Sequence, residues 1–197
     1  MVRGWHKEND KWKYYSPKKM SIYGRTFVEG EKVTGWLPIN DKWYYIAEDG
    51  YMVTGIYKVG NRKYLFMEDG SMKTGWFKVD GTWYYISPDG ELRAQWVKSL
   101  SNWYYVDVDG KMVTGYQTIN GAKYYFASSG LMQKDWFKIN GEDYYAASSG
   151  TIQAQWVKSG RNWYYVDTDG KMVTGDYIID GKVNYFDNQG LWMNKMN

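Results

Sequence analysis

One pair of chemically distinctive side chains, two tryptophans seven residues apart, occurs four times between residues 36 and 163. The pairs are Trp36 with Trp43, Trp76 with Trp83, Trp96 with Trp103, and Trp156 with Trp163. Two indole rings and a tyrosine from the next part of the chain would form a three-sided aromatic box that is open to water. Such a box suits a quaternary ammonium group, because electron-rich ring faces attract a diffuse cation that makes no hydrogen bonds. The pairs therefore predict sites for a methylated cation.

The alternative interpretation is that these tryptophans form the core of a protein that has little else to bury. Aromatic residues make up 20% of the 197 residues, so they must supply the packing, the binding or both. At the corresponding positions of other segments the sequence has Ile56, Asp176, Lys63, Lys123, Asp143 and Val183. Segments without the pair are nevertheless expected to fold, and this favours a binding role for the pair.

The pairs are carried by a repeat of twenty residues. Eight repeats follow one another without a gap, beginning at Gly35, Gly55, Gly75, Gln95, Gly115, Asp135, Gln155 and Gly175. We number the positions of a repeat as places, counted from its first residue, so the paired tryptophans stand at places two and nine. Place sixteen is glycine in every repeat, which indicates a turn that needs positive φ. An aromatic run such as WYYVD, an Asp-Gly turn and a second run such as KMVT predict a β-hairpin, and the eight largely polar residues before it, such as QWVKSGRN, are expected to form a connecting loop.

The predicted organisation is an irregular N-terminal repeat or cap at residues 1–34, eight repeats at 35–194, and a tail at 195–197. A lone hairpin is marginally stable in water, so each must bury its apolar face against its neighbours. We therefore expect an all-β solenoid of stacked hairpins. Strand alternation predicts that Trp163 and Tyr165 share one face, and that Tyr164 and Val166 share the other. The distribution of tryptophan pairs returns every sixty residues, which predicts about three hairpins per superhelical turn.

The motif GWxxxxGxWYYxxxDGxMxTG, present in residues 75–90 and 155–175, resembles the choline-binding repeat of pneumococcal surface proteins, autolysins and phage lysins. The resemblance covers nearly the whole chain. It implies a left-handed β-solenoid in which choline lies between consecutive hairpins, held by two tryptophans of one repeat and an aromatic residue of the next, often with a methionine nearby. The implied ligand is the phosphocholine of teichoic and lipoteichoic acids. It would hold the protein non-covalently on the outside of the bacterial cell wall.

The resemblance assigns four boxes to this sequence. They are Trp36, Trp43 and Tyr64; Trp76, Trp83 and Tyr105; Trp96, Trp103 and Tyr125; and Trp156, Trp163 and Tyr185. Methionines that could line them are Met52, Met112 and Met172. Trp5 and Trp12 are a further candidate pair within the irregular first repeat. Boxes opening from the repeats at 55, 115 and 135 are expected to be incomplete, and none is expected after the repeat at 175.

Other classes of function have little support in the sequence. A formal charge of +3 with mixed signs argues against a nucleic-acid groove, and the absence of cysteine removes thiolate metal sites. His6 is the only histidine, so the sequence gives little support to histidine-based catalysis. Asp107 with Asp109, and Asp167 with Asp169, begin like a calcium loop but lack its remaining ligands, so we interpret them as turn residues. We expect no enzyme activity, metal or cofactor in this chain, although a longer parent protein could carry a catalytic domain.

Two other interpretations remain open. The glucan-binding repeats of glucansucrases and the receptor-binding repeats of clostridial toxins share the YYF and glycine periodicity, and the repeat GYQTINGAKYYFASSG is the most similar to them. An array of this kind would bind carbohydrate. The module could also act as an adhesin for a host protein or as a regulator of autolysins. No stretch is long and apolar enough to cross a bilayer, the first residues lack the apolar core of a signal peptide, and residues 185–196 could form a homodimer contact.

Overall fold

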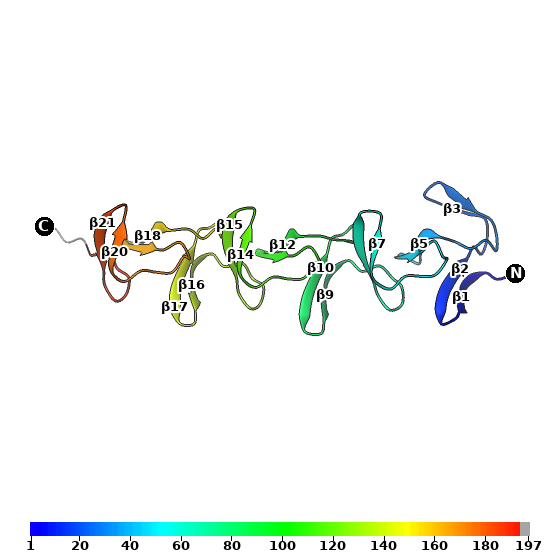
Figure 1. The fold of residues 1–197 in the computed structure, drawn as a ribbon, viewed down its shortest axis with the longest axis horizontal. Coiled ribbons are helices and arrows are strands. Elements are labelled where there is room, and N and C mark those ends of the chain that lie inside the picture. The colour runs from blue at the N-terminus through cyan, green and yellow to red at the C-terminus, as the bar shows by residue number, and fades with distance from the viewer. Residues whose placement is uncertain (194–197) are drawn as a thin grey trace. The chain divides into compact units, whose positions relative to one another are not determined.

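The computed structural model describes residues 1–193, and every regular element in this part of the chain is a β-strand (Figure 1). The strands are β1 (Gly4–Glu8), β2 (Lys11–Tyr15), β3 (Met20–Ile22), β4 (Arg25–Phe27), β5 (Gly35–Ile39), β6 (Lys42–Ile46), β7 (Gly55–Val59), β8 (Arg62–Phe66), β9 (Gly75–Val79), β10 (Thr82–Ile86), β11 (Glu91–Leu92), β12 (Gln95–Ser99), β13 (Asn102–Val106), β14 (Gly115–Ile119), β15 (Ala122–Phe126), β16 (Asp135–Ile139), β17 (Glu142–Ala146), β18 (Gln155–Ser159), β19 (Asn162–Val166), β20 (Gly175–Ile179) and β21 (Lys182–Phe186). They pair in chain order as hairpins, and β11 joins β8 as a third strand. The predicted tail, and part of the predicted dimer segment 185–196, lie outside the described residues.

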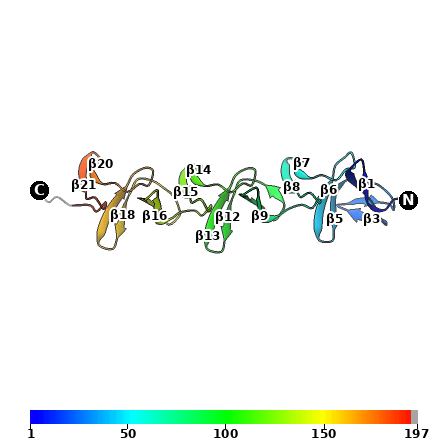
Figure 2. The same cartoon turned by 90° about the horizontal axis from the view of Figure 1, so that it is seen from below.

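The chain divides into two compact units. The first contains residues 1–95 and 106–111, and the second contains residues 96–105 and, within the described chain, 112–193. In each unit the hairpins follow one another in chain order and project in different directions from the line along which they stack (Figures 1 and 2). Within residues 1–193, no helix is long and apolar enough to span a membrane.

The expected all-β architecture of repeated hairpins is confirmed. The predicted pairing within a repeat is wrong: the aromatic strand Asn162–Val166 pairs with Gln155–Ser159, which was expected to be a loop. Within its own repeat, the KMVT run after the Asp-Gly turn makes only an isolated bridge, between Val166 and Met172.

The register of each hairpin places both tryptophans of a pair on one face. In β18–β19, Trp156 lies opposite Tyr165, and Lys158 lies opposite Trp163. Directly opposed residues of an antiparallel pair point to the same side of the sheet. Trp156 and Trp163 are therefore diagonal neighbours, and the predicted grouping of Trp163 with Tyr165 is confirmed.

The other face of each hairpin supplies the core. Place twelve is no more than 1% exposed in all eight repeats, where it is occupied by Ile46, Phe66, Ile86, Val106, Phe126, Ala146, Val166 and Phe186. Hairpins with and without the tryptophan pair thus bury the same position. The first tryptophan of a pair adds to this core from its edge, since Trp36 packs on Phe66 with 5.9 Å between ring centroids. The core and binding interpretations therefore both apply to place two.

Place eighteen links each repeat to both of its neighbours. Its backbone N–H donates to the place-nine carbonyl oxygen of the preceding repeat, as from Met72 to Trp43 at 2.6 Å and from Met132 to Trp103 at 2.9 Å. Its side chain packs on the place-sixteen glycine of the following repeat. At Gly70, where φ is +77°, an added Cβ would overlap the sulfur of Met52. This glycine is needed for its backbone conformation and also for the space that it leaves.

Ion pairs repeat with the predicted period of sixty residues. Lys63, at place nine of a repeat that lacks the pair, lies 2.9 Å from Asp109, which is at place fifteen two repeats later. Sixty residues further along the chain, Lys123 lies 2.5 Å from Asp169 in the same relation. Two of the repeats without a second tryptophan therefore use place nine for an ion pair between repeats. The equivalence of repeats three apart is visible in these contacts.

The acidic residues that resemble the beginning of a calcium loop cap their own turns. The Asp107 carboxylate accepts hydrogen bonds from the backbone N–H groups of Asp109 and Lys111, both at 2.9 Å. Within residues 1–193 there is no group of three or more histidine, cysteine, aspartate or glutamate side chains placed to hold a metal ion. The geometry is that of a turn stabilised by its own aspartate.

Candidate functional site

The two tryptophans of every predicted pair stand at right angles. Their ring centroids are 6.2 to 6.4 Å apart and their planes cross at 85° to 87° in all four pairs. This constancy follows from the register, because places two and nine are always diagonal neighbours on one face of a hairpin. Each pair therefore supplies two perpendicular walls with the same geometry.

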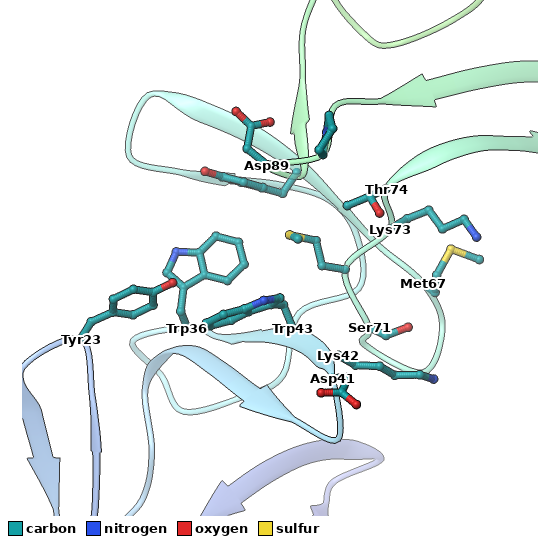
Figure 3. Close-up of a pocket in the computed structure, with 13 residues that line it drawn as sticks. Tyr23, Trp36, Asp41, Lys42, Trp43, Met67, Ser71, Lys73, Thr74 and Asp89 are labelled. Carbon is teal, nitrogen blue, oxygen red and sulfur yellow. The ribbon is translucent and has the colours of Figure 1, made fainter. Parts of the chain in front are cut away.

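The pair formed by Trp36 and Trp43 is completed by the next repeat. Tyr64 lies 4.8 Å from Trp36, with the two ring planes at 78°. These three rings and Met72 line a cavity of about 950 Å³. Figure 3 shows Trp36 and Trp43 side by side at this cavity. The structure thus brings together all three predicted aromatic residues of this box. The adjoining methionine is Met72, while the predicted Met52 lies elsewhere.

In the pair formed by Trp96 and Trp103, the third ring is Tyr124 and not the predicted Tyr125. Tyr124 lies 5.0 Å from Trp96 at 71°, whereas Tyr125 stacks on Phe137 at 5.5 Å. Adjacent strand residues point to opposite faces, so only one of the two tyrosines can reach the tryptophans. Sequence counting could have found Tyr124, because it occupies the same place ten as Tyr64. Met132 lines the small cavity beside Trp103.

Single substitutions should separate the two tyrosines. In Tyr124→Ala, we expect the site at Trp96 and Trp103 to lose choline affinity by about three- to tenfold, because one aromatic wall is removed. In Tyr125→Ala, we expect that affinity to persist and the thermal midpoint to fall, because the stack on Phe137 is lost. Choline titration and thermal denaturation of both variants provide the measurement. Loss of affinity only in Tyr125→Ala would contradict the assignment of Tyr124 to the box.

The pair formed by Trp156 and Trp163 is completed by a third tryptophan. Place ten of the following repeat is Asn184, and Trp192 takes the position against Trp156 at 5.4 Å and 75°. The Trp192 indole N–H donates to the amide oxygen of Asn184 at 3.1 Å, which fixes the ring. The predicted Tyr185 lies opposite Asp176, on the other face of the hairpin from Asn184. Trp192 stands where five other repeats have methionine and two have leucine or isoleucine, and this exchange was the signal available in the sequence.

The pair formed by Trp76 and Trp83 belongs to the first unit, where Tyr85 packs against Trp76 at 5.1 Å. Its predicted third member, Tyr105, belongs to the second unit. Within that unit Tyr105 packs on Trp96 at 5.2 Å. Tyr105 is thus a neighbour of a different tryptophan pair from the one to which the sequence assigned it.

The irregular first repeat also forms an aromatic cavity. Trp5 lies 5.1 Å from Tyr44, and a cavity of about 260 Å³ is lined by these two residues together with Trp12, Met52 and Asp69. The N–H of Met52 donates to the carbonyl oxygen of Trp12 at 2.7 Å. The predicted liner Met52 therefore lines this site. The candidate pair Trp5 and Trp12 thus lines a cavity together with a tyrosine of the next repeat.

Of the other two predicted methionines, Met172 is also hydrogen-bonded to the preceding repeat. The N–H of Met172 donates to the carbonyl oxygen of Asp143, in the hairpin whose Trp136 lies 5.4 Å from Tyr164. Asp143 stands where the second tryptophan would be, so this box has one indole wall fewer than the others. Met112 packs on the backbone of Gly130.

Carboxylates at place fifteen, two repeats further along the chain, face two of the cavities. Asp69 lines the cavity at Trp5, and hydrogen bonds from Ser71 and then Lys42 lower the pKa of Asp69 to about 2. Asp89 lines the cavity at Trp36. Burial raises the pKa of Asp89, but hydrogen bonds from Ser87 and Arg93 outweigh this effect and lower the pKa to about 2. Both cavities therefore combine aromatic walls with a nearby negative charge at neutral pH.

In three of the pairs a lysine ammonium group lies over the second indole. The ammonium groups of Lys78, Lys98 and Lys158 lie over the rings of Trp83, Trp103 and Trp163 at 5.7, 5.7 and 5.4 Å. These distances are within the range of a cation–π contact. Opposite Trp43 the corresponding residue is Pro38, so that ring has no such lysine.

Comparison with protein families identifies the repeat. Residues 33–61, 53–95, 113–154 and 153–195 match the family model of the choline-binding repeat, which covers more than half of the chain. The chain belongs to the choline-binding repeat family. Residues 95–112 match a second family model, that of a cell wall binding repeat. The motif resemblance seen in the sequence is therefore confirmed.

Solved structures of choline-binding repeat proteins have the same fold. The choline-binding domain of CbpL from Streptococcus pneumoniae aligns with a TM-score of 0.62 at 24% identity, covering 98% of both chains. Choline binding protein F of that organism aligns at 0.51 and 24%, covering 96% of this chain and 92% of its own. The modular autolysin LytC, also pneumococcal, aligns at 0.60 and 21%, and the match covers 96% of this chain but 48% of the autolysin. The predicted β-solenoid is confirmed. A comparison with curated protein sequences gives no match.

Proposed function

We propose that this chain is a non-catalytic binding module that attaches to phosphocholine on teichoic and lipoteichoic acids of a bacterial cell wall. The observation that carries the proposal is the site at Trp36, where Trp43, Tyr64 and Met72 complete an aromatic cavity. A trimethylammonium group would lie between the ring faces, and the Asp89 carboxylate would add long-range attraction. Two other repeats support this assignment, because they have a lysine at place nine where this box has Trp43. Each lysine pairs with an aspartate that occupies the same place as Asp89: Lys63 with Asp109, and Lys123 with Asp169.

Repetition would make weak sites useful. A cation–π contact contributes about 0.5 to 2 kcal/mol, so one box of three rings would bind choline in roughly the millimolar range. A polymer that carries many choline groups would engage several boxes at once. Each additional contact would then be intramolecular, and the overall affinity would rise by about 10² to 10⁴. A protein bound in this way would lie on the outer surface of the cell, held without a covalent bond.

A titration of the full chain tests the proposal. We expect choline at millimolar concentration to change the tryptophan fluorescence and to raise the thermal midpoint, because ligand binds only to the folded boxes. A neutral isostere, in which carbon replaces the nitrogen, should act much more weakly because it lacks the charge. A response to glucan oligosaccharides but not to choline would favour the carbohydrate-binding alternative. No response to either ligand would leave the aromatic pairs as packing residues.

A further inference from the structure

The irregular first repeat contains a small hairpin, β3–β4, whose turn has an unusual residue at its tip. Tyr23 and Gly24 connect the paired residues Ile22 and Arg25, and their φ angles are +47° and +79°. A two-residue turn with positive φ at both positions strongly prefers asparagine followed by glycine. A bulky side chain is disfavoured in this conformation. The chemistry of the turn therefore does not explain why the residue is tyrosine.

The Tyr23 ring lies against the aromatic box at Trp36. It stacks on Trp43 with 5.7 Å between centroids and 23° between planes, and Figure 3 shows it beside the two tryptophans. Nevertheless 77% of Tyr23 is exposed, so most of the ring remains open to solvent. The neutral Pro38, which replaces the lysine found opposite the second tryptophan in other pairs, faces Trp43 from the neighbouring strand. The box at Trp36 thus has an additional aromatic surface that is available to a ligand.

The hairpin that carries Tyr23 is firmly supported. Ile22 and Phe27 are buried in the same core cluster as Leu37, which lies in the hairpin of the box itself. The hydroxyl groups of Ser21 and Thr26 are hydrogen-bonded at 2.9 Å across the strands. The support therefore holds Tyr23 in place beside the box, although the turn conformation is costly for this residue.

The cavity at this box is larger than a cation requires. Its volume is about 950 Å³, compared with about 260 Å³ at Trp5 and 140 Å³ at Trp103. Pockets of about 300 to 1,000 Å³ hold ligands of drug size. Besides the rings, the polar side chains of Asp41, Ser71 and Asp89 line it. Aromatic and hydrogen-bonding groups together suit a sugar next to a cation.

We propose that Tyr23 forms a saccharide subsite beside the aromatic box of Trp36, Trp43 and Tyr64, which we call the first box. The choline group lies among Trp36, Trp43 and Tyr64, and the sugar that carries its phosphodiester places an apolar C–H face on Tyr23. Polar side chains of the cavity bind its hydroxyl groups. This inference rests on the proposed function for the cation, but the contact with Tyr23 is an independent claim. It makes the first box selective for choline phosphate attached to a sugar.

Fluorine NMR of the full chain labelled with fluorotryptophan can observe single sites. The signals of Trp43 and Trp163 are assigned from Trp43→Phe and Trp163→Phe, and Trp163 reports a box without an added tyrosine. The probes are free choline and a hexosamine glycoside of phosphocholine. We expect the glycoside to bind about three- to tenfold more tightly than choline at Trp43, from one aromatic stacking contact, and equally at Trp163.

Two variants isolate the role of the Tyr23 ring. Tyr23→Asn gives the turn its preferred residue, so the hairpin should remain folded while the preference for the glycoside disappears. Tyr23→Phe keeps the ring and should keep the preference. An equal loss of affinity for both ligands in Tyr23→Asn would overturn the subsite, because the tyrosine would then only support Trp43. If Trp163 responds to choline and Trp43 shows no preference, the subsite fails and the proposed function stands; if neither signal responds to choline, the proposed function fails.

Discussion

The variant Trp83→Ala/Trp103→Ala/Trp163→Ala is expected to bind a choline-bearing polymer about a hundredfold more weakly than the wild type. Each substitution removes one wall from a separate box, so several simultaneous contacts are lost and the gain from multivalency falls with them. These three residues stand at place nine and are 42%, 39% and 39% exposed. Their removal should therefore cost little folding free energy. Binding to immobilised polymer and thermal denaturation measure the two effects separately.

A matched control comes from a repeat that has no pair. Val183 also stands at place nine and is 69% exposed, so Val183→Ala should change neither polymer affinity nor stability. Free choline should still bind the triple variant at the site of Trp36, Trp43 and Tyr64. Polymer affinity within twofold of the wild type would contradict the multivalent mechanism. A large fall in the thermal midpoint would show that the place-nine indoles are core residues after all.

Gly70→Ala is expected to cost about 2 to 5 kcal/mol of folding free energy. The left-handed conformation at φ +77° accounts for about 1 to 2 kcal/mol, and overlap of the new methyl group with Met52 adds about 1 to 3 kcal/mol. Gly75→Ala is the control, because Gly75 has φ +74° but nothing lies within 4 Å of an added Cβ. It should show the conformational cost alone. Denaturant midpoints of the two variants give the difference.

The packing contribution can be tested by a double variant. In Gly70→Ala/Met52→Ala the overlap disappears, so the loss of stability should be smaller than the sum of the two single losses. Strict additivity would show that the methionine does not press on the turn. Equal midpoints for Gly70→Ala and Gly75→Ala would lead to the same conclusion. The result decides whether place eighteen stiffens the connection between consecutive repeats.

The repeated hairpins could be predicted from the sequence, because aromatic runs and turn residues recur every twenty residues. Alternation also fixes which face each residue of the aromatic strand occupies. The partner of that strand was predicted wrongly: Asn162–Val166 pairs with Gln155–Ser159, which precedes it, and not with the KMVT run after the Asp-Gly turn. Turn residues flank the aromatic strand on both sides, so local signals alone did not decide between the two partners. The right-angle geometry of Trp156 and Trp163 follows from the observed register.

The third wall of each box could not be predicted as reliably, because it depends on how one hairpin meets the next. Counting gave Tyr64 at place ten but Tyr125 at place eleven, and the strand turns these two places to opposite faces. A methionine lines the box of the preceding repeat because its backbone N–H donates a hydrogen bond to that repeat, as from Met72 to Trp43. Nothing in the periodicity reveals this bond. The stack of Tyr23 on Trp43 was equally hidden, since it comes from a segment without a repeat pattern.

The ion pairs between repeats two apart constrain how such an array can change in length during evolution. Deleting a single repeat would break the ion pair between Lys63 and Asp109, because residues at these places would no longer be two repeats apart in the same order. Deleting three repeats preserves this relation, because Lys123 and Asp169 reproduce the same contact sixty residues later. Residues 95–114 and 155–174 are identical at all but three positions, which would favour recombination between them. Gene duplication and loss should therefore alter the array in steps of sixty residues, adding or removing whole sets of boxes at once.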